Sequence, residues 1–143
     1  MADKTYKSFT GKRKEAVARL RMYLTGLPVV VDVDVKKGDI LVNNKKAEVY
    51  FSGVVAKATY EEPFRITNTL EKYTLTVKVQ GGGPKGQMEA FIHAVSRVLS
   101  SMDEKNKAIL KKKGFLTRDA RVRERRKVGM GGKARRKRQS PKR

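Results

Sequence analysis

The sequence contains no cysteine and no tryptophan, and it has a single histidine. The lack of cysteine excludes disulfide bonds and thiolate metal sites, and one histidine leaves too few soft ligands for a zinc centre. We therefore expect no metal site and no cofactor. General-base catalysis would rest on His93 alone, without a second histidine to assist it, so we expect no catalytic residues.

Long hydrophobic runs are also missing from the chain. No apolar run approaches the roughly 18 residues that a membrane-spanning helix requires. Residues 1–6 lack the hydrophobic stretch of a secretory signal. We expect a cytoplasmic protein with no membrane partner.

Acidic side chains are scarce, with 14 of them against 35 lysine and arginine residues, which gives a net charge of +21. The imbalance is greatest in residues 125–143, which hold ten basic side chains and no acidic one. Because such a segment repels itself and has little apolar surface to bury, we expect it not to fold alone. Dense positive charge favours a nucleic acid as the first partner and an anionic membrane only as the second.

The chain of 143 residues has room for one domain with one core. Composition divides it into a globular body over residues 1–117 and a basic tail over residues 118–143. The 19 residues from position 125 onward, fully extended, would reach roughly 60 Å, so the tail can carry charge far from the body.

Three segments in the first third of the chain have the patterns of strands. In residues 15–24, apolar side chains alternate with residues that include Arg19 and Arg21, which predicts a strand with one cationic face. Residues 29–35 also alternate, and residues 39–44 are rich in β-formers and end at a polar pair. The polar turn between the last two segments predicts that they form a hairpin.

Two short helices are expected next, over residues 47–51 and 53–60. We expect the second helix to end before Pro63, because the residue that precedes a proline avoids helical backbone angles.

The strongest local pattern is a strand over residues 73–79, a break at Gly81–Gly83 and Pro84 at the first position of a long helix. Apolar residues at spacings of three and four allow this helix to lie on a sheet. They are Met88, Phe91, Ile92, Val95, Val98, Leu99 and Met102. Asp103 is expected to cap a further helix that ends at Gly114.

Residues 81–86 satisfy the dinucleotide-binding pattern G-x-G-x-x-G, and Asp103 follows about 20 residues on. That pattern needs its acidic residue at the end of a second parallel strand, whereas Asp103 precedes a lysine-rich helix, so a dinucleotide enzyme is disfavoured. Gln87 stands where a Walker A loop requires lysine. Two interpretations stay open: a helix N-terminus that holds a nucleic-acid phosphate with Lys85, or a tight strand-to-helix turn.

Two other groups of polar residues are interpreted as surface or packing residues. Asp32 and Asp34 lie roughly 6.6 Å apart by strand rise, but Lys36 and Lys37 would keep both carboxyls ionised, so a catalytic pair is not expected. His93 lies off the apolar stripe, and we interpret it as a packing residue or an RNA contact.

A second basic cluster lies near the start of the chain, at residues 12–14 together with the strand cations Arg19 and Arg21. A cationic body with a reaching tail is how small proteins bind folded RNA through its shape and phosphates. The tail from residue 125 contains no aromatic residue, so base stacking is not expected to be its main mode of binding.

Four segments in order resemble one known family. They are GKRKEAVAR at residues 11–19, ILVN at residues 40–43, Gly-Gly-Gly-x-x-Gly-Gln at residues 81–87, and KARR at residues 133–136 with the terminal Lys142-Arg143. The chain resembles ribosomal protein nine of the small subunit, in its bacterial or organellar form. The resemblance implies a two-layer α/β domain of the α+β kind, similar to the second domain of ribosomal protein five, with a left-handed βαβ crossover.

The resemblance also implies a non-enzymatic role in the cytoplasmic ribosome. The body would bind small-subunit rRNA in the head, beside neighbouring ribosomal proteins, and the tail would contact peptidyl-site tRNA. The tRNA contacts implied are Arg138, Lys142 and Arg143. The rRNA contacts expected are Lys12, Arg13, Lys14, Arg19, Gly81, Gly82, Gly83, Lys85, Gln87, Arg118, Arg121, Arg125, Arg126, Lys127, Lys133, Arg135 and Arg136.

The chain departs from the family pattern at two places. Ser140-Pro141 stands where an aromatic residue is usual, and residues 24–37 are longer than usual, for which we expect an extended hairpin. A rival hypothesis is a general RNA chaperone with an unspecific basic tail, which predicts steep salt dependence with little preference among RNAs.

Overall fold

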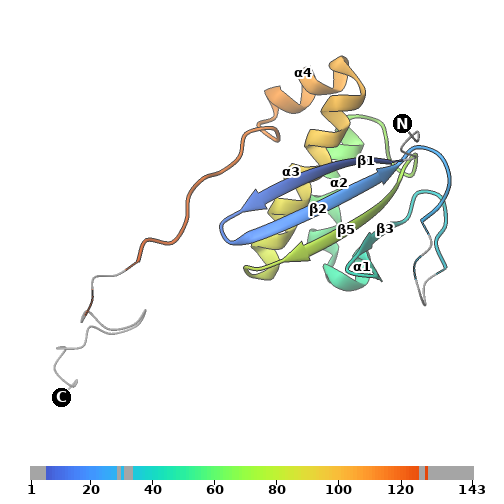
Figure 1. Ribbon diagram of the computed structural model, residues 1–143. Helices are drawn as coiled ribbons and strands as arrows, with labels where there is room; N and C mark the ends of the chain where they lie inside the picture. Colours follow the sequence, from blue (N-terminus) through green and yellow to red (C-terminus); the bar gives the residue numbers. More distant parts are fainter. Residues whose placement is uncertain (1–5, 29, 31–33, 126–127, 129–143) are drawn as a thin grey trace, which may run out of the picture.

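The computed structural model describes residues 6–28, 30, 34–125 and 128 of the chain (Figure 1). The predicted contacts Arg126, Lys127, Lys133, Arg135, Arg136, Arg138, Lys142 and Arg143 therefore lie outside the described residues.

The core of the molecule is a mixed sheet of five strands in the order β1-β2-β5-β3-β4. The strands are β1 (Tyr6–Arg13), β2 (Ala16–Tyr23), β3 (Ile40–Val42), β4 (Lys45–Lys46) and β5 (Thr74–Gln80). Neighbouring strands are antiparallel except β3 and β5, which are parallel. A parallel pair needs a crossover connection, and the segment between these two strands supplies it with two helices.

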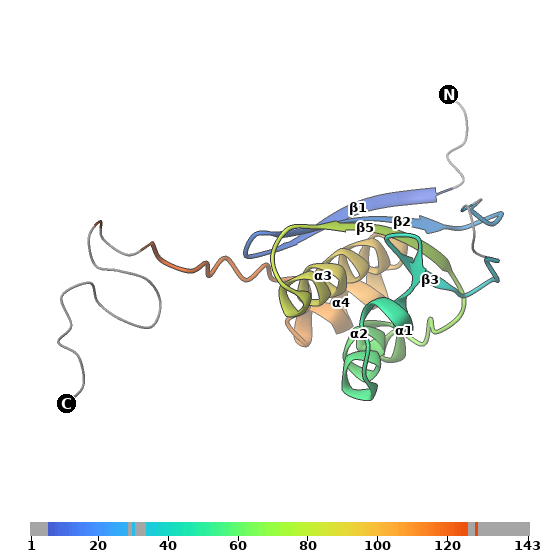
Figure 2. The same ribbon diagram turned by 90° about the horizontal axis from the view of Figure 1, so that it is seen from below.

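Four helices lie on one face of this sheet, so the fold has two layers (Figure 2). They are α1 (Ala47–Tyr50), α2 (Val54–Ile66), α3 (Pro84–Met102) and α4 (Glu104–Lys112). The mixed α/β architecture expected from the sequence is confirmed. None of these helices has the length and apolar character needed to cross a membrane.

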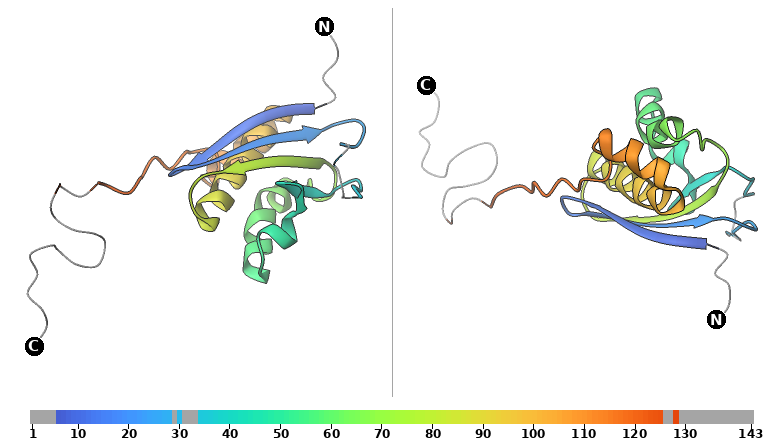
Figure 3. Two further views of the ribbon diagram at one scale, coloured as in Figure 1. Left: turned by 60° about the horizontal axis from the view of Figure 1, so that its bottom comes forward. Right: turned by 90° about the horizontal axis from the view of Figure 1, so that it is seen from above.

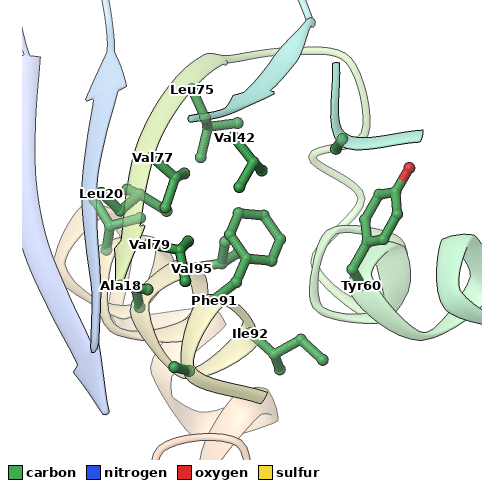
Figure 4. Close-up of a cluster of buried hydrophobic side chains, with 14 of the residues drawn as sticks. Ala18, Leu20, Val42, Tyr60, Leu75, Val77, Val79, Phe91, Ile92 and Val95 are labelled. Carbon is green, nitrogen blue, oxygen red and sulfur yellow. The ribbon is translucent and has the colours of Figure 1, made fainter. Parts of the chain in front are cut away.

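Alternation in β2 and β5 separates the two faces of the sheet. In β2, Ala18, Leu20 and Met22 are buried against the helices, whereas Arg19 and Arg21 are exposed. This arrangement confirms the strand predicted over residues 15–24. The side chains of α3 interlock with this inner face, and Phe91 lies near the middle of the cluster (Figure 4).

Helix α3 confirms the predicted pattern of apolar residues. Five residues of the stripe, Phe91, Ile92, Val95, Val98 and Leu99, are buried. Met88 and Met102 at the two ends are only partly buried.

The predicted ends of both long helices are also confirmed. Pro84 is at the start of α3 and Gly83 precedes it. Asp103 caps α4, since its Oδ1 accepts a hydrogen bond of 3.0 Å from the backbone N–H of Lys105. Gly114 follows α4 with a φ of 80°, which suits a helix C-terminus.

Two local expectations are corrected by the structure. The hairpin of residues 29–35 with 39–44 is wrong, because β3 has β5 on one side and β4 on the other; residues 30 and 34–36 form no strand. The helix expected over 53–60 continues through Pro63 to Ile66. Pro63 forfeits one backbone hydrogen bond near the helix end, and burial of its ring and of Phe64 offsets that loss.

Strand β1 is an element that the sequence patterns missed, because its residues are mostly polar or charged. It lies close to α3, and Gly11 is the residue that permits the approach. A Cβ placed on Gly11 would lie 2.0 Å from the carbonyl oxygen of Ala90 and 2.6 Å from the nitrogen of Ala94. Only a residue without a side chain fits between the strand and the helix.

Candidate nucleic-acid interface

Two predicted groups of contacts meet at one end of the body. The turn between β1 and β2 lies against the glycine loop between β5 and α3: a Cβ on Gly81 would lie 2.5 Å from the carbonyl oxygen of Glu15. Gly81 and Gly82 have φ angles of 74° and 62°, a conformation that favours glycine. The exposed Lys14 and Lys85 lie in these neighbouring segments, so fold topology joins two basic groups that are about 70 positions apart in sequence.

Gln87 is held by a hydrogen-bond network inside the protein. Its Nε2 donates to the carbonyl oxygen of Gly81 at 3.0 Å, and its Oε1 accepts from the hydroxyl of Tyr50 at 2.8 Å. Asn43 donates to that hydroxyl and also pairs with the backbone of Val79. The amide of Gln87 therefore braces the glycine loop and connects it to α1 and β3.

Arg13 makes three contacts within the protein, although its position in a basic cluster suggested an RNA ligand. Its Nε donates to Glu89 at 2.7 Å, its Nη2 lies 2.9 Å from Asp119, and its Nη1 donates to the carbonyl oxygen of Arg121 at 2.7 Å. Only 11% of the Arg13 side chain is exposed. This guanidinium ties the start of the segment after α4 to the body.

The residues that follow α4 pass beside the turn between β1 and β2 (Figure 2). Among the predicted contacts here, Arg118, Arg121 and Arg125 are exposed. Arg121 pairs with Asp119 at 2.6 Å. The Arg121 guanidinium and backbone N–H, with Arg13 close by, hold the pKa of the Asp119 carboxyl far below its usual range. Asp119 therefore stays ionised and keeps both arginines in place.

His93 is a partly buried residue of α3. Burial, with the nearby Arg97 and Arg118, lowers its pKa, while a hydrogen bond to the backbone of Leu116 works in the opposite direction. Its Nδ1 is buried and has no hydrogen-bond partner among the described residues. The neutral ring, with its proton on Nε2, fits this environment, because a proton on Nδ1 would find no acceptor there.

Apart from Arg13, the predicted contacts on strands lie on the face of the sheet away from the helices. Arg19 is exposed there, directly opposite Lys78 of β5 in the strand register, and Arg21 lies opposite Thr76. Lys12 is also exposed, near the end of β1. The sequence patterns did not single out Lys78; its alternation with Val77 and Val79 was the available signal, but only the register places it beside Arg19.

The geometry does not support a dinucleotide site at residues 81–86. The strand, turn and helix are present, but Asp103 lies beyond the far end of a helix of 19 residues, about 28 Å from its start by helical rise. Its carboxylate caps α4. No group of three or more acidic, histidine or cysteine side chains suited to a metal occurs among the described residues. Asp34 is exposed, and Asp32 lies outside the described part of the chain.

Comparison with known proteins gives the same answer as the motifs. The family described as "Ribosomal protein S9/S16" matches residues 11–143. The chain is 41% identical over 129 residues to "Small ribosomal subunit protein uS9" of Maridesulfovibrio salexigens, covering 90% of this chain and 91% of that protein. It is 42% identical over 123 residues to the protein of the same name from Desulfosudis oleivorans, covering 86% of each.

The match extends through both basic clusters, the glycine loop and the tail. A profile match over more than nine tenths of the chain, two bacterial relatives above 40% identity and the absence of a dinucleotide-site geometry in the described body all agree. The chain belongs to the ribosomal protein S9/S16 family and is a non-enzymatic structural constituent of the small ribosomal subunit.

Proposed function

We propose that the body of this protein binds rRNA in the head of the small subunit, and that its tail contacts peptidyl-site tRNA during translation. The observation that carries the proposal is the distribution of positive charge over the body and the tail, in a chain that belongs to a ribosomal family. Residues 125–143 hold ten basic and no acidic side chains, and the body is itself cationic. So dense a run of positive charge, with no acidic side chain to offset it, favours binding to a polyanion.

Within the body, the end formed by the β1–β2 turn and the glycine loop is the proposed rRNA contact nearest to the tail. Lys12, Lys14 and Lys85 are exposed there, and the exposed backbone of residues 81–83 allows close approach of a phosphate. Arg13 and Gln87, through their internal contacts, hold this surface in position. Arg118, Arg121 and Arg125 continue the positive charge into the tail.

Within the tail, Arg138, Lys142 and Arg143 are the proposed tRNA contacts. Arginine suits the last position because its planar guanidinium can grip a phosphate with two hydrogen bonds, which a lysine cannot do. Five further cations of the tail, Arg126, Lys127, Lys133, Arg135 and Arg136, are proposed to neutralise rRNA along the path to the tRNA.

The proposal includes the finer architecture of the family. We propose a globular domain over residues 1–117 and a tail over 118–143, with the crossover from β3 to β5 left-handed as in the second domain of ribosomal protein five. The parallel pairing of β3 with β5, with α1 and α2 between them, supports a βαβ crossover. Its hand would be against the general preference for right-handed connections.

The test places a photo-crosslinker at position 143 in cells, purifies the small subunit and sequences the RNA attached. The proposal predicts crosslinks to tRNA anticodon stems and to rRNA close to them. A matched control carries the crosslinker at Lys112, which is exposed at the end of α4, and should give no tRNA. Crosslinks from position 143 scattered over cellular RNAs would instead identify an unspecific RNA chaperone.

A further inference from the structure

The sheet has an open face that no helix of the described residues covers. Figures 2 and 3 show all four helices on the opposite side. The open face is hollowed, and the hollow runs across β1, β2, β5 and the end of β3. Its polar lining includes Ser8, Thr10, Arg19, Arg21, Thr76 and Lys78. None of the residues that line it is acidic.

The three cations that line the hollow, Arg19, Arg21 and Lys78, have no ion-pair partner in the described part of the protein. Arg19 and Lys78 lie directly opposite each other on neighbouring antiparallel strands, an arrangement in which like charges repel. Arg21 lies two residues from Arg19 on the same face, roughly 6.6 Å away by strand rise. Within the described residues, the fold thus concentrates positive charge here without a carboxylate to pair with it.

One of these cations is held in position by an aromatic ring. The guanidinium carbon of Arg21 lies 5.1 Å from the centre of the Tyr6 ring. This contact orients the guanidinium without neutralising it, because the ring carries no net charge. Arg21 therefore keeps its full charge for a partner outside the protein.

The chemistry of the open face fits a phosphodiester backbone. Guanidinium and ammonium groups contact phosphate oxygens directly, and the hydroxyls of Ser8, Thr10 and Thr76 are donors of the kind that bind phosphate and sugar oxygens. An interface with a stable protein partner has few charged residues at its centre, and a surface that binds lipid needs apolar side chains to insert into the membrane. The centre of this face offers neither, because Arg19, Arg21 and Lys78 occupy it.

We propose that the open face of the sheet is a second RNA-binding surface of the body, on which Arg19, Arg21 and Lys78 hold the phosphate backbone of small-subunit rRNA. This surface differs in role from the end formed by the β1–β2 turn, where Arg13 forms ion pairs with Glu89 and Asp119 inside the protein. This inference rests on the proposed function, since it takes the rRNA as the occupant.

The experiment measures binding of the full-length protein to a transcript of the head domain of the small-subunit rRNA as a function of salt concentration. The test variant is the double substitution Arg21→Ala with Lys78→Ala. The control is the double substitution Lys111→Ala with Lys112→Ala, which removes the same charge from exposed positions at the end of α4. Urea unfolding of all three proteins establishes that each is folded.

The slope of log K against log salt is negative, and we expect the test variant to make it less steep by about 0.7–0.9 for each cation removed, and the control to leave it unchanged. Equal slopes for the two double variants would overturn the open face as an RNA-binding surface. The proposed function is tested separately, by binding of the unmodified protein to an unrelated RNA of equal length. Equal affinity for the two RNAs would contradict the specific rRNA role, whatever the slopes show.

Discussion

The two faces of the sheet are built from the same strands but differ in packing and charge. The inner face is so tightly packed against α3 that Gly11 has no room for a methyl group. The open face exposes Arg19, Arg21 and Lys78 with no carboxylate beside them in the described structure. The packed inner face therefore stabilises the fold. The open face instead holds like charges that repel each other, and a bound polyanion would neutralise them.

The comparison also separates two arginines that look alike in sequence. Arg13 is largely buried, and its guanidinium binds two carboxylates and a carbonyl. Arg21 is exposed and touches an uncharged ring. A basic cluster in a sequence therefore does not reveal which of its members are available to RNA.

The largest expected effect is that of Gly11→Ala on the inner face. The added methyl group would meet backbone atoms of Ala90 and Ala94, which cannot move without displacing α3 from β1. We expect the free energy of unfolding to fall by about 3 kcal/mol, measured by urea denaturation. Gly83→Ala is the control, because a Cβ there meets no atom within 4 Å, and it should cost less than about 1 kcal/mol. Equal losses would refute the close approach of β1 to α3.

The next effect in size is that of Arg13→Met, which keeps much of the aliphatic packing but removes the charge. Glu89 and Asp119 lose their shared partner, and the loss should be about 2 kcal/mol in the free energy of unfolding. Partial exposure of both carboxylates keeps it below the cost of breaking a deeply buried pair.

The same variant should release residues 118–121 from the body, which amide hydrogen exchange would detect as faster exchange at Arg121. Lys12→Met, at an exposed position, is the control and should change neither quantity. If Arg13→Met left stability and exchange unaltered, the internal role of Arg13 would be wrong.

A smaller effect on the same packed layer is a pH dependence from His93. Burial lowers its pKa in the folded protein, so between the unfolded value near 6.5 and the lower folded value the unfolded chain binds more protons. This contribution is fully present above the unfolded pKa and is lost as pH falls through the folded one. We expect the loss of stability between pH 7.5 and 5.5 to be smaller in His93→Gln. Parallel curves for the two proteins would argue against a partly buried, neutral histidine.

The smallest expected effect on stability lies on the open face. Lys78→Thr removes the like charge opposite Arg19 and introduces a residue that favours strands. We expect the free energy of unfolding to stay equal or to rise by up to about 0.5 kcal/mol, while binding to head-domain rRNA weakens. A clear loss of stability would mean that Lys78 supports the fold and would remove the contrast between the two faces.

The periodic spacing of apolar residues predicted the strands and the helix that bury one face against the core. Residues 15–24, 73–79 and the stripe of α3 became β2, β5 and the core helix, because alternation and helical spacing record burial directly. Strand β1 escaped prediction because it is a mostly polar edge strand whose pairing partner, β2, determines its structure. The continuation of α2 through Pro63 depends on burial of the proline ring in the tertiary structure, and rules based on neighbouring residues do not account for that burial.

The candidate site was predictable in composition but not in arrangement. The glycine loop and the residues at positions 12–14 were recognised as separate motifs, and their contact through Glu15 is a product of the fold. The hydrogen bonds from Arg13 to Glu89 and between Gln87 and Tyr50 join residues more than 30 positions apart, so spacing alone could not reveal them. The role proposed for Lys78 likewise needed the strand register.

The most direct test of the central claim is a cryo-electron microscopy structure of the assembled small subunit that contains this protein. The account predicts rRNA phosphates within ion-pair distance of Arg19, Arg21 and Lys78, with Arg13 still bound to Glu89 and Asp119 inside the protein. An open face that contacts another protein or only solvent, or an Arg13 turned outward onto RNA, would contradict it.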